Sequence, residues 1–229
     1  MTNPERITIA VDTAQGVSGL LQTPRDARVC YVVAHGAGAG MTHPFMTAVA
    51  NELTDRGIAT LRYQFPYMEQ GSKRPDSPRL AQATVRAAVA EASRLQPELP
   101  LFAGGKSFGG RMTSQAQAAT PLTGVRGLVF LGFPLHPAGR PSDERAEHLF
   151  AVHVPMLFLQ GTRDQLADPQ LLQSLVEKLG ARTTLKWFQD ADHSFHVPAR
   201  TGRKDPEIMK EMLSALTDWI DATIARPIK

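Results

Sequence analysis

The chain has 229 residues, of which 42% are hydrophobic and 21% charged, proportions ordinary for a globular protein with a sizeable core. Its formal net charge is +3, and Lys and Arg are scattered along the chain, which argues against a nucleic-acid-binding protein. The single cysteine, Cys30, excludes an internal disulfide and lies in an apolar run typical of a buried residue. No apolar run is long enough to span a membrane, and the first residues lack the layout of a signal peptide, so we expect a cytoplasmic protein.

Short apolar runs alternate with longer helical patterns, and eight of the runs are candidate strands. The first two are separated by the turn-like sequence DTAQG, which predicts an antiparallel hairpin. The third run is apolar almost throughout, as expected for a strand that is buried on both faces of a sheet. The eight candidate strands are residues 6–11, 17–22, 28–36, 57–65, 99–105, 127–133, 154–161 and 183–189.

Five further segments predict helices. Pro44 stands at a first-turn position, Asp168 precedes Pro169 as a candidate N-cap, and Gly180 follows the end of the same helix. The candidate helices are residues 44–57, 78–96, 108–120, 168–180 and 205–225.

Strands that alternate with helices predict one α/β domain over residues 1–229, with a mostly parallel sheet covered on both faces. Segments 66–78 and 134–144 are rich in Pro, Gly and charge and are not assigned to an element. Both follow candidate strands, at the edge of the sheet where α/β proteins form their binding crevices.

The stretch LFAGGKSFGGRM, residues 101–112, carries two competing signatures. Gly105-Lys106-Ser107 matches the end of a phosphate-binding loop, but the first glycine of that loop would stand at Pro100, which has no backbone N–H for a phosphate. Residues 105–109 also match G-x-S-x-G, with a candidate strand before the serine and a candidate helix after it. In such a turn the serine is strained and exposed, and glycines avoid crowding. We therefore interpret Ser107 as a nucleophile rather than a simple helix cap.

A serine hydroxyl needs a base to take its proton, and in this arrangement the partners follow in the order Ser, Asp or Glu, His. Asp164 comes just after the seventh candidate strand, and His193 comes just after the eighth. Asp168 is the rival acid, although it directly precedes a proline as a helix cap would. His196 is the rival base, three residues past His193.

The segment after the third candidate strand, YVVAHGAGAGMTHPF, predicts an oxyanion site. His35-Gly36-Ala37-Gly38 is similar to the turn that supplies one backbone N–H to a tetrahedral intermediate, and the residue after the nucleophile, Phe108, supplies the second. We expect Ala37 to be the first donor, with Gly38 as the alternative, and His35 to orient the loop.

We expect the other polar residues near these motifs to have structural roles. Asp190 and Asp192 are expected to be surface carboxylates of a loop. Satisfied or exposed side chains are expected for the histidines His136, His148 and His153. Pairing with loop carboxylates or carbonyls is expected for Arg62, Arg111 and Arg145, and contact with an acidic substrate is the alternative. Lys106 points either into the pocket or away from it.

The motifs AHGAGAGMTHPFM, RYQFPYM, GGKSFGGRM, GFPLHPAGRPSDERAEHL, LFLQGTRDQL and DADHSF together resemble the α/β-hydrolase superfamily over nearly the whole chain. They are most similar to a branch that includes bacterial hydrolase-like proteins, testis-expressed hydrolase-like proteins and a hydrolase-like subunit of a chromatin-modifying complex. Dienelactone hydrolases are more distant, and they use cysteine where this chain has Ser107. The resemblance implies an α/β-hydrolase fold without a large cap domain, and the triad Ser107, Asp164 and His193.

The residues and the resemblance together predict a serine hydrolase that cleaves a small ester through an acyl-enzyme intermediate. A catalytically inactive binding or scaffold module with the same fold is the alternative, and acyl transfer to another acceptor would use the same residues. The chain has no H-E-x-x-H motif and no cysteine cluster, so we expect neither a metal nor a cofactor. The expected partner is a small-molecule ester, without nucleic acid or membrane.

Overall fold

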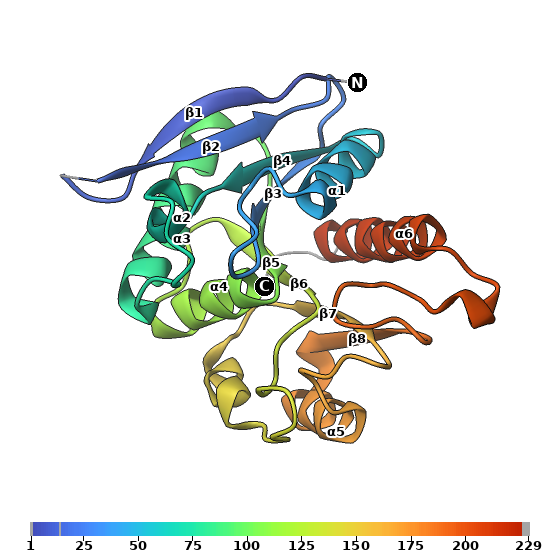
Figure 1. The fold of residues 1–229 in the computed structure, drawn as a ribbon. Helices are drawn as coiled ribbons and strands as arrows, with labels where there is room; N and C mark the ends of the chain where they lie inside the picture. The colour runs from blue at the N-terminus through green and yellow to red at the C-terminus, as the bar shows by residue number, and fades with distance from the viewer. Residues whose placement is uncertain (1, 14, 226–229) are drawn as a thin grey trace.

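A computed structural model describes residues 2–13 and 15–225, and within them eight strands form one sheet in the order β1-β2-β4-β3-β5-β6-β7-β8 (Figure 1). The hairpin of β1 (Glu5–Ala10) and β2 (Gly16–Gln22) is antiparallel, and β2 pairs antiparallel with β4 (Ile58–Tyr63). Every other pair in the sheet is parallel. The remaining strands are β3 (Val29–Ala34), β5 (Leu101–Lys106), β6 (Val125–Leu131), β7 (Met156–Gly161) and β8 (Thr183–Phe188). The predicted mostly parallel eight-stranded sheet is confirmed.

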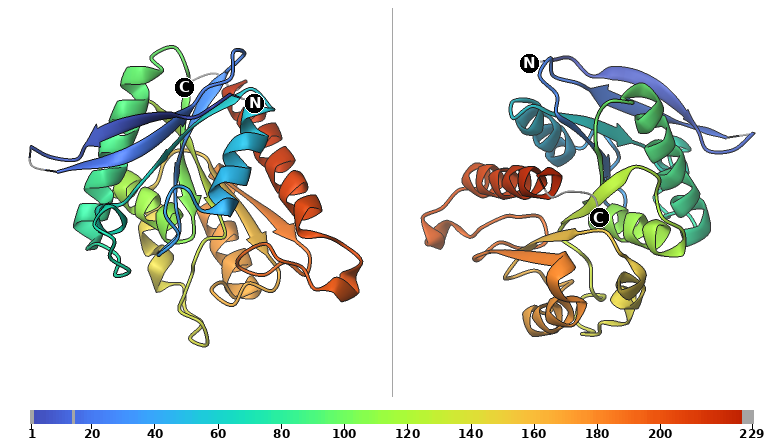
Figure 2. Two further views of the ribbon diagram at one scale, coloured as in Figure 1. Left: turned by 45° about the horizontal axis from the view of Figure 1, so that its top comes forward. Right: turned by 180° about the vertical axis from the view of Figure 1, so that it is seen from behind.

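Helices cover both faces of the sheet (Figures 1 and 2). One face packs against α1 (Pro44–Thr54) and α6 (Asp205–Ile224), whose buried residues share a core cluster. The other face packs against α3 (Pro78–Leu95), α4 (Phe108–Ala119) and α5 (Pro169–Leu179).

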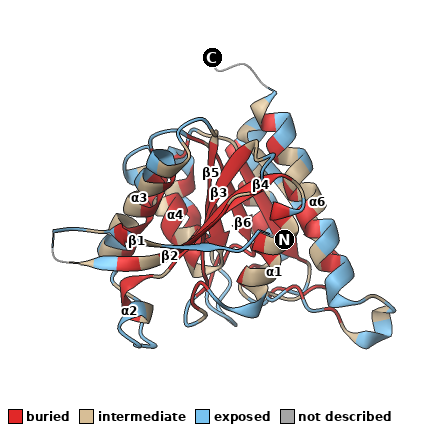
Figure 3. Ribbon diagram, turned by 90° about the horizontal axis from the view of Figure 1, so that it is seen from above, coloured by how far each residue is buried: buried red, intermediate tan, exposed pale blue. Residues whose placement is uncertain are grey.

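The central strands separate these two cores. All six residues of β3 are buried, and successive side chains of a strand point to opposite faces of its sheet. Cys30, Val32 and Ala34 accordingly lie in the core under α3 and α4. Val29, Tyr31 and Val33 lie in the core under α1 and α6. Figure 3 shows the consequence: the central strands are buried, whereas the edge strand β1 and the outer surfaces of the helices carry exposed residues.

The helices differ from their predicted bounds mainly at their ends. α1 ends at Thr54 because Asp55 and Arg56 turn the chain toward Gly57, where φ is +70°. The unassigned segment 66–78 contains one short helix, α2 (Pro66–Glu69). Three 3₁₀ helices were not predicted: Glu144–Ala151, Gly180–Arg182 and Ala199–Thr201.

The chain order creates a crevice at one edge of the sheet. From β3 the chain moves to β4 on one side, and it then returns to add β5 on the other side of β3. The loops after β3 and β5 therefore diverge at adjacent strand ends, the place where ligands bind in open α/β sheets. Between β6 and β7 the only helical element is the short helix Glu144–Ala151, so this fold has no cap domain over the crevice.

Candidate active site

The turn between β5 and α4 places Ser107 at the end of the sheet. Ser107 has φ 51° and ψ −116°, a backbone conformation that is costly for a residue with a side chain. A Cβ at Gly105 would collide with the carbonyl oxygen of Ala34, and one at Gly109 would lie 2.6 Å from the Cβ of Ala34. The predicted strand, tight turn and helix are all present, and the two glycines let the turn fit against β3.

Three side chains from separate loops form one hydrogen-bonded chain. His193 Nε2 lies 2.8 Å from Ser107 Oγ, and His193 Nδ1 lies 2.7 Å from Asp164 Oδ2. The carboxylate can only accept, so Nδ1 carries the proton and Nε2 accepts from the serine hydroxyl. The structure thus brings the three predicted side chains together in the order that proton transfer from serine requires.

The surroundings of Asp164 hold its carboxylate in place. Its side chain has 0% exposed surface, and its two oxygens accept from Gln160 Nε2 at 2.5 Å and from the backbone N–H of Leu166 at 2.8 Å. Hydrogen bonds of this kind stabilise an ionised carboxylate. Together with His193 these groups use the hydrogen-bonding capacity of the carboxylate and fix its orientation.

The rival residues are engaged elsewhere. Asp168 Oδ1 accepts from the backbone N–H groups of Gln170 and Leu171, so it caps α5 as its sequence position indicated. His196 is exposed, and its Nδ1 lies 2.8 Å from Asp205 Oδ2. Asp192 Oδ1 accepts from the backbone of Ser194 and His196 and thereby shapes the loop that carries His193.

The remaining predicted histidines are satisfied or exposed. His136 is buried, and its Nε2 accepts from the backbone N–H of Asp168 at 2.7 Å. His148 lies 2.7 Å from Ser114 Oγ, and burial lowers the pKa of its imidazole to about 4. His153 is exposed.

The loop after β3 is held by the segment after β4 through three hydrogen bonds. His35 Nε2 accepts from the backbone N–H of Phe65 at 3.2 Å. The backbone N–H of Gly38 donates to Tyr67 Oη at 2.9 Å, and that of Met41 donates to Gln64 Oε1 at 2.9 Å. Sequence reasoning gave a role to His35 but missed Gln64 and Tyr67, although both stand in the motif RYQFPYM.

Burial explains why His35 can act as a fixed element. Its imidazole is fully buried, and this desolvation lowers the pKa of His35 to about 4. Nδ1 lies 2.7 Å from the carbonyl oxygen of Gly36, so Nδ1 carries the single proton while Nε2 accepts. The neutral ring bridges the two loops without introducing a charge beside Ser107.

The hydrogen bond to Tyr67 also distinguishes between the two candidate oxyanion donors, Ala37 and Gly38. The N–H of Gly38 is engaged, whereas that of Ala37 has no acceptor among the described residues. Phe108 is the first residue of α4, where the backbone N–H has no partner within the helix. Ala37 and Phe108 therefore each carry an N–H available to a ligand.

The arginines of the sequence motifs do not line the hollow beside Ser107. Arg62 is buried and donates to the carbonyl of Met41 and to the hydroxyl of Thr47, which agrees with the structural role expected for it. Burial, and then the positive charge of Arg145, lowers the pKa of Arg111.

Lys106 turns toward the loop after β8. Its ammonium donates to the carbonyl oxygen of His193 at 2.6 Å and lies 5.7 Å from the ring centroid of Phe195. The residue between the glycine and serine of the turn is thus in contact with the loop that carries the histidine.

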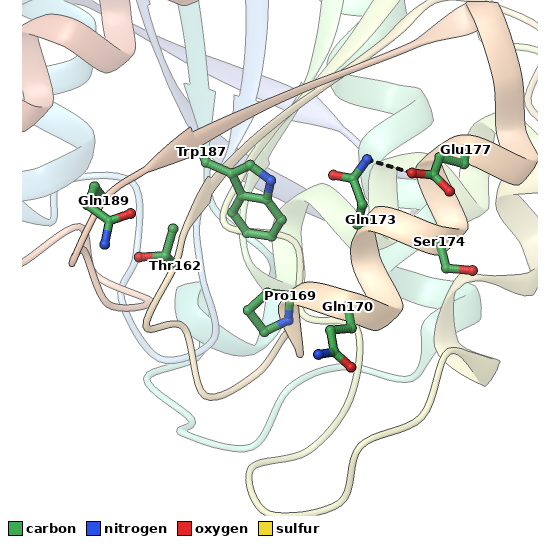
Figure 4. A pocket seen from close by; sticks show the side chains of 8 residues that line it. All are labelled: Thr162, Pro169, Gln170, Gln173, Ser174, Glu177, Trp187 and Gln189. Atoms are coloured by element: carbon green, nitrogen blue, oxygen red, sulfur yellow. Dashed lines mark hydrogen bonds between the residues drawn. The ribbon is translucent and has the colours of Figure 1, made fainter.

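A hollow of about 400 Å³ opens beside Ser107. It is lined by Gly36, Ala37, Ala39, His43, Phe45, Met46, Lys106, Ser107, Leu166, His193 and Ser194. A larger hollow, about 560 Å³, lies between α5 and β8, where Trp187 faces the side chains of the helix (Figure 4). None of the three hydrogen-bonded residues lines that second hollow, and a third hollow of about 470 Å³ is lined by His193 but not by Ser107. The hollow that Ser107 and His193 both line is therefore the candidate active site.

Two further properties bear on the kind of site. Within residues 2–13 and 15–225, no group of three or more His, Cys, Asp or Glu side chains is arranged to hold a metal ion. Among the helices of this same part of the chain, none combines the length and hydropathy that crossing a bilayer requires.

A mostly parallel sheet without a cap, with a serine-bearing turn between β5 and α4, is the architecture of the α/β-hydrolase fold. Residues 27–221 match the family model described as an alpha/beta hydrolase domain. The chain therefore belongs to the alpha/beta hydrolase family, which confirms the family that its motifs resembled.

Solved structures share this fold at low sequence identity. XC6422 from Xanthomonas campestris, described as an α/β serine hydrolase without lid, is 23% identical with a TM-score of 0.73, covering 96% of both chains. A dienelactone hydrolase from Anabaena variabilis is 20% identical with a TM-score of 0.76, covering 96% of this chain and 98% of its own. Est1E from Butyrivibrio proteoclasticus is 15% identical with a TM-score of 0.75, covering 96% and 99%.

Proposed function

We propose that this protein is a serine hydrolase that cleaves small carboxylic esters through an acyl-enzyme intermediate. The observation that supports this most directly is the hydrogen-bonded chain from Ser107 Oγ through His193 to the buried carboxylate of Asp164. Serine is activated as a nucleophile when a neighbouring base takes its proton and a third group orients that base.

In the proposed reaction, Ser107 Oγ attacks the acyl carbon and its proton passes to His193 Nε2. Asp164 keeps the imidazole in the correct tautomer and stabilises its positive charge. The N–H groups of Ala37 and Phe108 donate to the oxyanion of the tetrahedral intermediate. His193 then gives its proton to the leaving alcohol. A water molecule, deprotonated by His193, attacks the acyl group, and the imidazolium returns that proton to Ser107 Oγ as the ester bond to the serine breaks and the acid is released.

Three features favour a small ester as substrate. The hollow beside Ser107 has a volume of about 400 Å³, enough for a compact substrate. The nucleophile is serine, which sets the chain apart from the cysteine chemistry of dienelactone hydrolases. Similar solved structures include an esterase domain from a Rhodothermus marinus protein.

The single buried cysteine fits a cytoplasmic enzyme, and the motifs favour the branch of testis-expressed hydrolase-like proteins.

Hydrolysis of p-nitrophenyl acetate by the wild type and by Ser107→Ala tests the proposal. We expect the variant to lose at least about 10³-fold in kcat, as serine hydrolases do without their nucleophile. A fluorophosphonate probe should label Ser107, as located by mass spectrometry of the peptide. Equal rates for the two proteins, or a folded wild type that is never labelled, would refute the proposal and favour a non-catalytic binding module. Product analysis with added alcohol separates hydrolysis from acyl transfer.

A further inference from the structure

The ammonium of Lys106 is a positive charge with no carboxylate of the described residues in direct contact, although Asp164 and Asp192 act on it at longer range. Its hydrogen bond to the carbonyl of His193 uses one of three N–H donors. Within the described part of the chain, Lys106 forms no ion pair with Asp or Glu. A partly buried charge of this kind is costly unless a ligand or a partner compensates it.

The local backbone leaves room for this ammonium. Gly132 follows β6 with φ +73°, and a Cβ at that position would lie 3.0 Å from Lys106 Nζ. The same Cβ would lie 3.4 Å from the carbonyl oxygen of His193. A glycine therefore stands at the point where a side chain would press against the Lys106–His193 contact.

The rest of the lining carries no negatively charged side chain, since none of the residues that line the hollow is Asp or Glu. The first turn of α1 contributes Phe45 and Met46, so the positive end of this 11-residue helix lies at the wall. His43 accepts a hydrogen bond at Nδ1 from the backbone of Phe45, which leaves its proton on Nε2. The hollow thus combines apolar walls with one ammonium and the N-terminal end of a helix.

The position of His193 indicates which part of an ester occupies this hollow. In the proposed mechanism His193 Nε2 gives a proton to the leaving oxygen, so the leaving alcohol must lie on the His193 side of Ser107. His193, Ser194 and Lys106 all line the hollow on that side.

We propose that Lys106 recognises a carboxylate on the leaving alcohol, so that preferred substrates are esters of small hydroxycarboxylic acids. This inference rests on the proposed hydrolase function. The carboxylate takes the free donors of the ammonium, and the apolar body of the alcohol packs against Phe45, Met46 and Leu166. Lys106 then has a second role beside its hydrogen bond to His193, because it selects the substrate.

The test compares 4-acetoxybenzoate with 4-acetoxybenzamide, which have the same shape but differ in charge. Each kcat/KM is divided by the rate of the same ester with hydroxide, to remove differences in leaving-group reactivity. We expect the wild type to prefer the anionic ester by about tenfold, the order of one charge-assisted hydrogen bond. Lys106→Met should reduce this preference to about one, and Lys106→Arg should retain most of it.

Two kinetic results would overturn the inference. The first is equal loss of activity toward both esters in Lys106→Met, which would mean that Lys106 only positions His193. The second is a Lys106-dependent preference for mono-p-nitrophenyl succinate over p-nitrophenyl butyrate with none among the acetoxy esters. That result would place the anion on the acyl side.

A binding measurement separates this inference from the proposed function. Calorimetry on Ser107→Ala should show benzoate binding about tenfold more tightly than benzamide at pH 7. Burial lowers the pKa of Lys106 to about 8, against the opposing charges of Asp164 and Asp192, so the preference should disappear by about pH 9.5. Preferential benzoate binding without any ester hydrolysis would support the anion site and refute the hydrolase. Hydrolysis without any preference for anions would refute the anion site alone.

Discussion

Replacement of Tyr67 by Phe removes one hydroxyl and tests whether the segment after β4 sets the geometry of the proposed oxyanion site. The hydroxyl accepts the N–H of Gly38 at 2.9 Å, next to the proposed donor Ala37. Gly38 is exposed, so water can replace the lost partner, and we expect a stability loss of only about 1 kcal/mol. For a chain of this size that corresponds to roughly 2–4 °C in Tm.

The effect on catalysis should be larger than the effect on stability. Complete loss of one oxyanion donor typically costs about 10²–10³ in kcat. Because Tyr67→Phe loosens the loop without removing the donor, we expect kcat for p-nitrophenyl acetate to fall about 10–30-fold. KM should stay within about twofold, since the oxyanion contact strengthens in the transition state rather than on binding.

Tyr31→Phe is the matched control. The Tyr31 hydroxyl donates to the carbonyl of Val129 at 3.1 Å in the buried core, so this variant also loses one hydroxyl hydrogen bond. It should be destabilised by a similar or greater amount and keep its kcat. If Tyr67→Phe retains wild-type kcat, or if both variants lose activity in proportion to stability, the role assigned to Tyr67 is wrong.

Three further predictions follow from the site and the core. Asp164→Asn should lower kcat about 10³–10⁴-fold with a normal far-UV CD spectrum, because the amide favours the wrong tautomer of His193; a loss below tenfold would contradict the triad. Gly109→Ala should lower the urea-unfolding free energy by more than about 3 kcal/mol, since its Cβ would lie 2.6 Å from the Ala34 Cβ; a near-neutral effect would contradict the close packing. The third concerns His35, whose pKa is lowered from 6.5 to about 4 by burial. As pH falls, the unfolded chain binds a proton at this imidazole before the folded chain does. Between pH 8 and pH 5 the residue should therefore lower the free energy of unfolding by about 2 kcal/mol. In urea titrations His35→Gln should reduce the dependence of the unfolding free energy on pH.

Much of the sheet could be predicted because its signals are local. The run at β3 is apolar along its length, and it is buried on both faces as expected. The start of α5 was marked by Asp168 and Pro169 and its end by Gly180, and the helix keeps these limits. The 3₁₀ helix Glu144–Ala151 was missed because its two buried residues, Ala146 and Leu149, give no repeating pattern.

In the candidate site, too, some residues could be predicted from the sequence and others could not. Ser107, Asp164 and His193 could be located because each directly follows a recognisable strand, and parallel strands end at one edge of the sheet. Tyr67 could not be assigned, since its role depends on where its hydroxyl lies relative to a loop 29 residues away. The direction of Lys106 likewise depends on its contact with His193, which lies 87 residues further along the chain.

The brief connection between β6 and β7 has a kinetic consequence. This stretch contains only the 3₁₀ helix Glu144–Ala151, so within the described residues no inserted cap has to move before a molecule reaches Ser107. Substrate entry and product departure then depend on diffusion through solvent and on the charge of the diffusing molecule. For the proposed hydrolase, turnover of reactive esters should consequently respond to solvent viscosity and ionic strength rather than to hinge motions of the chain.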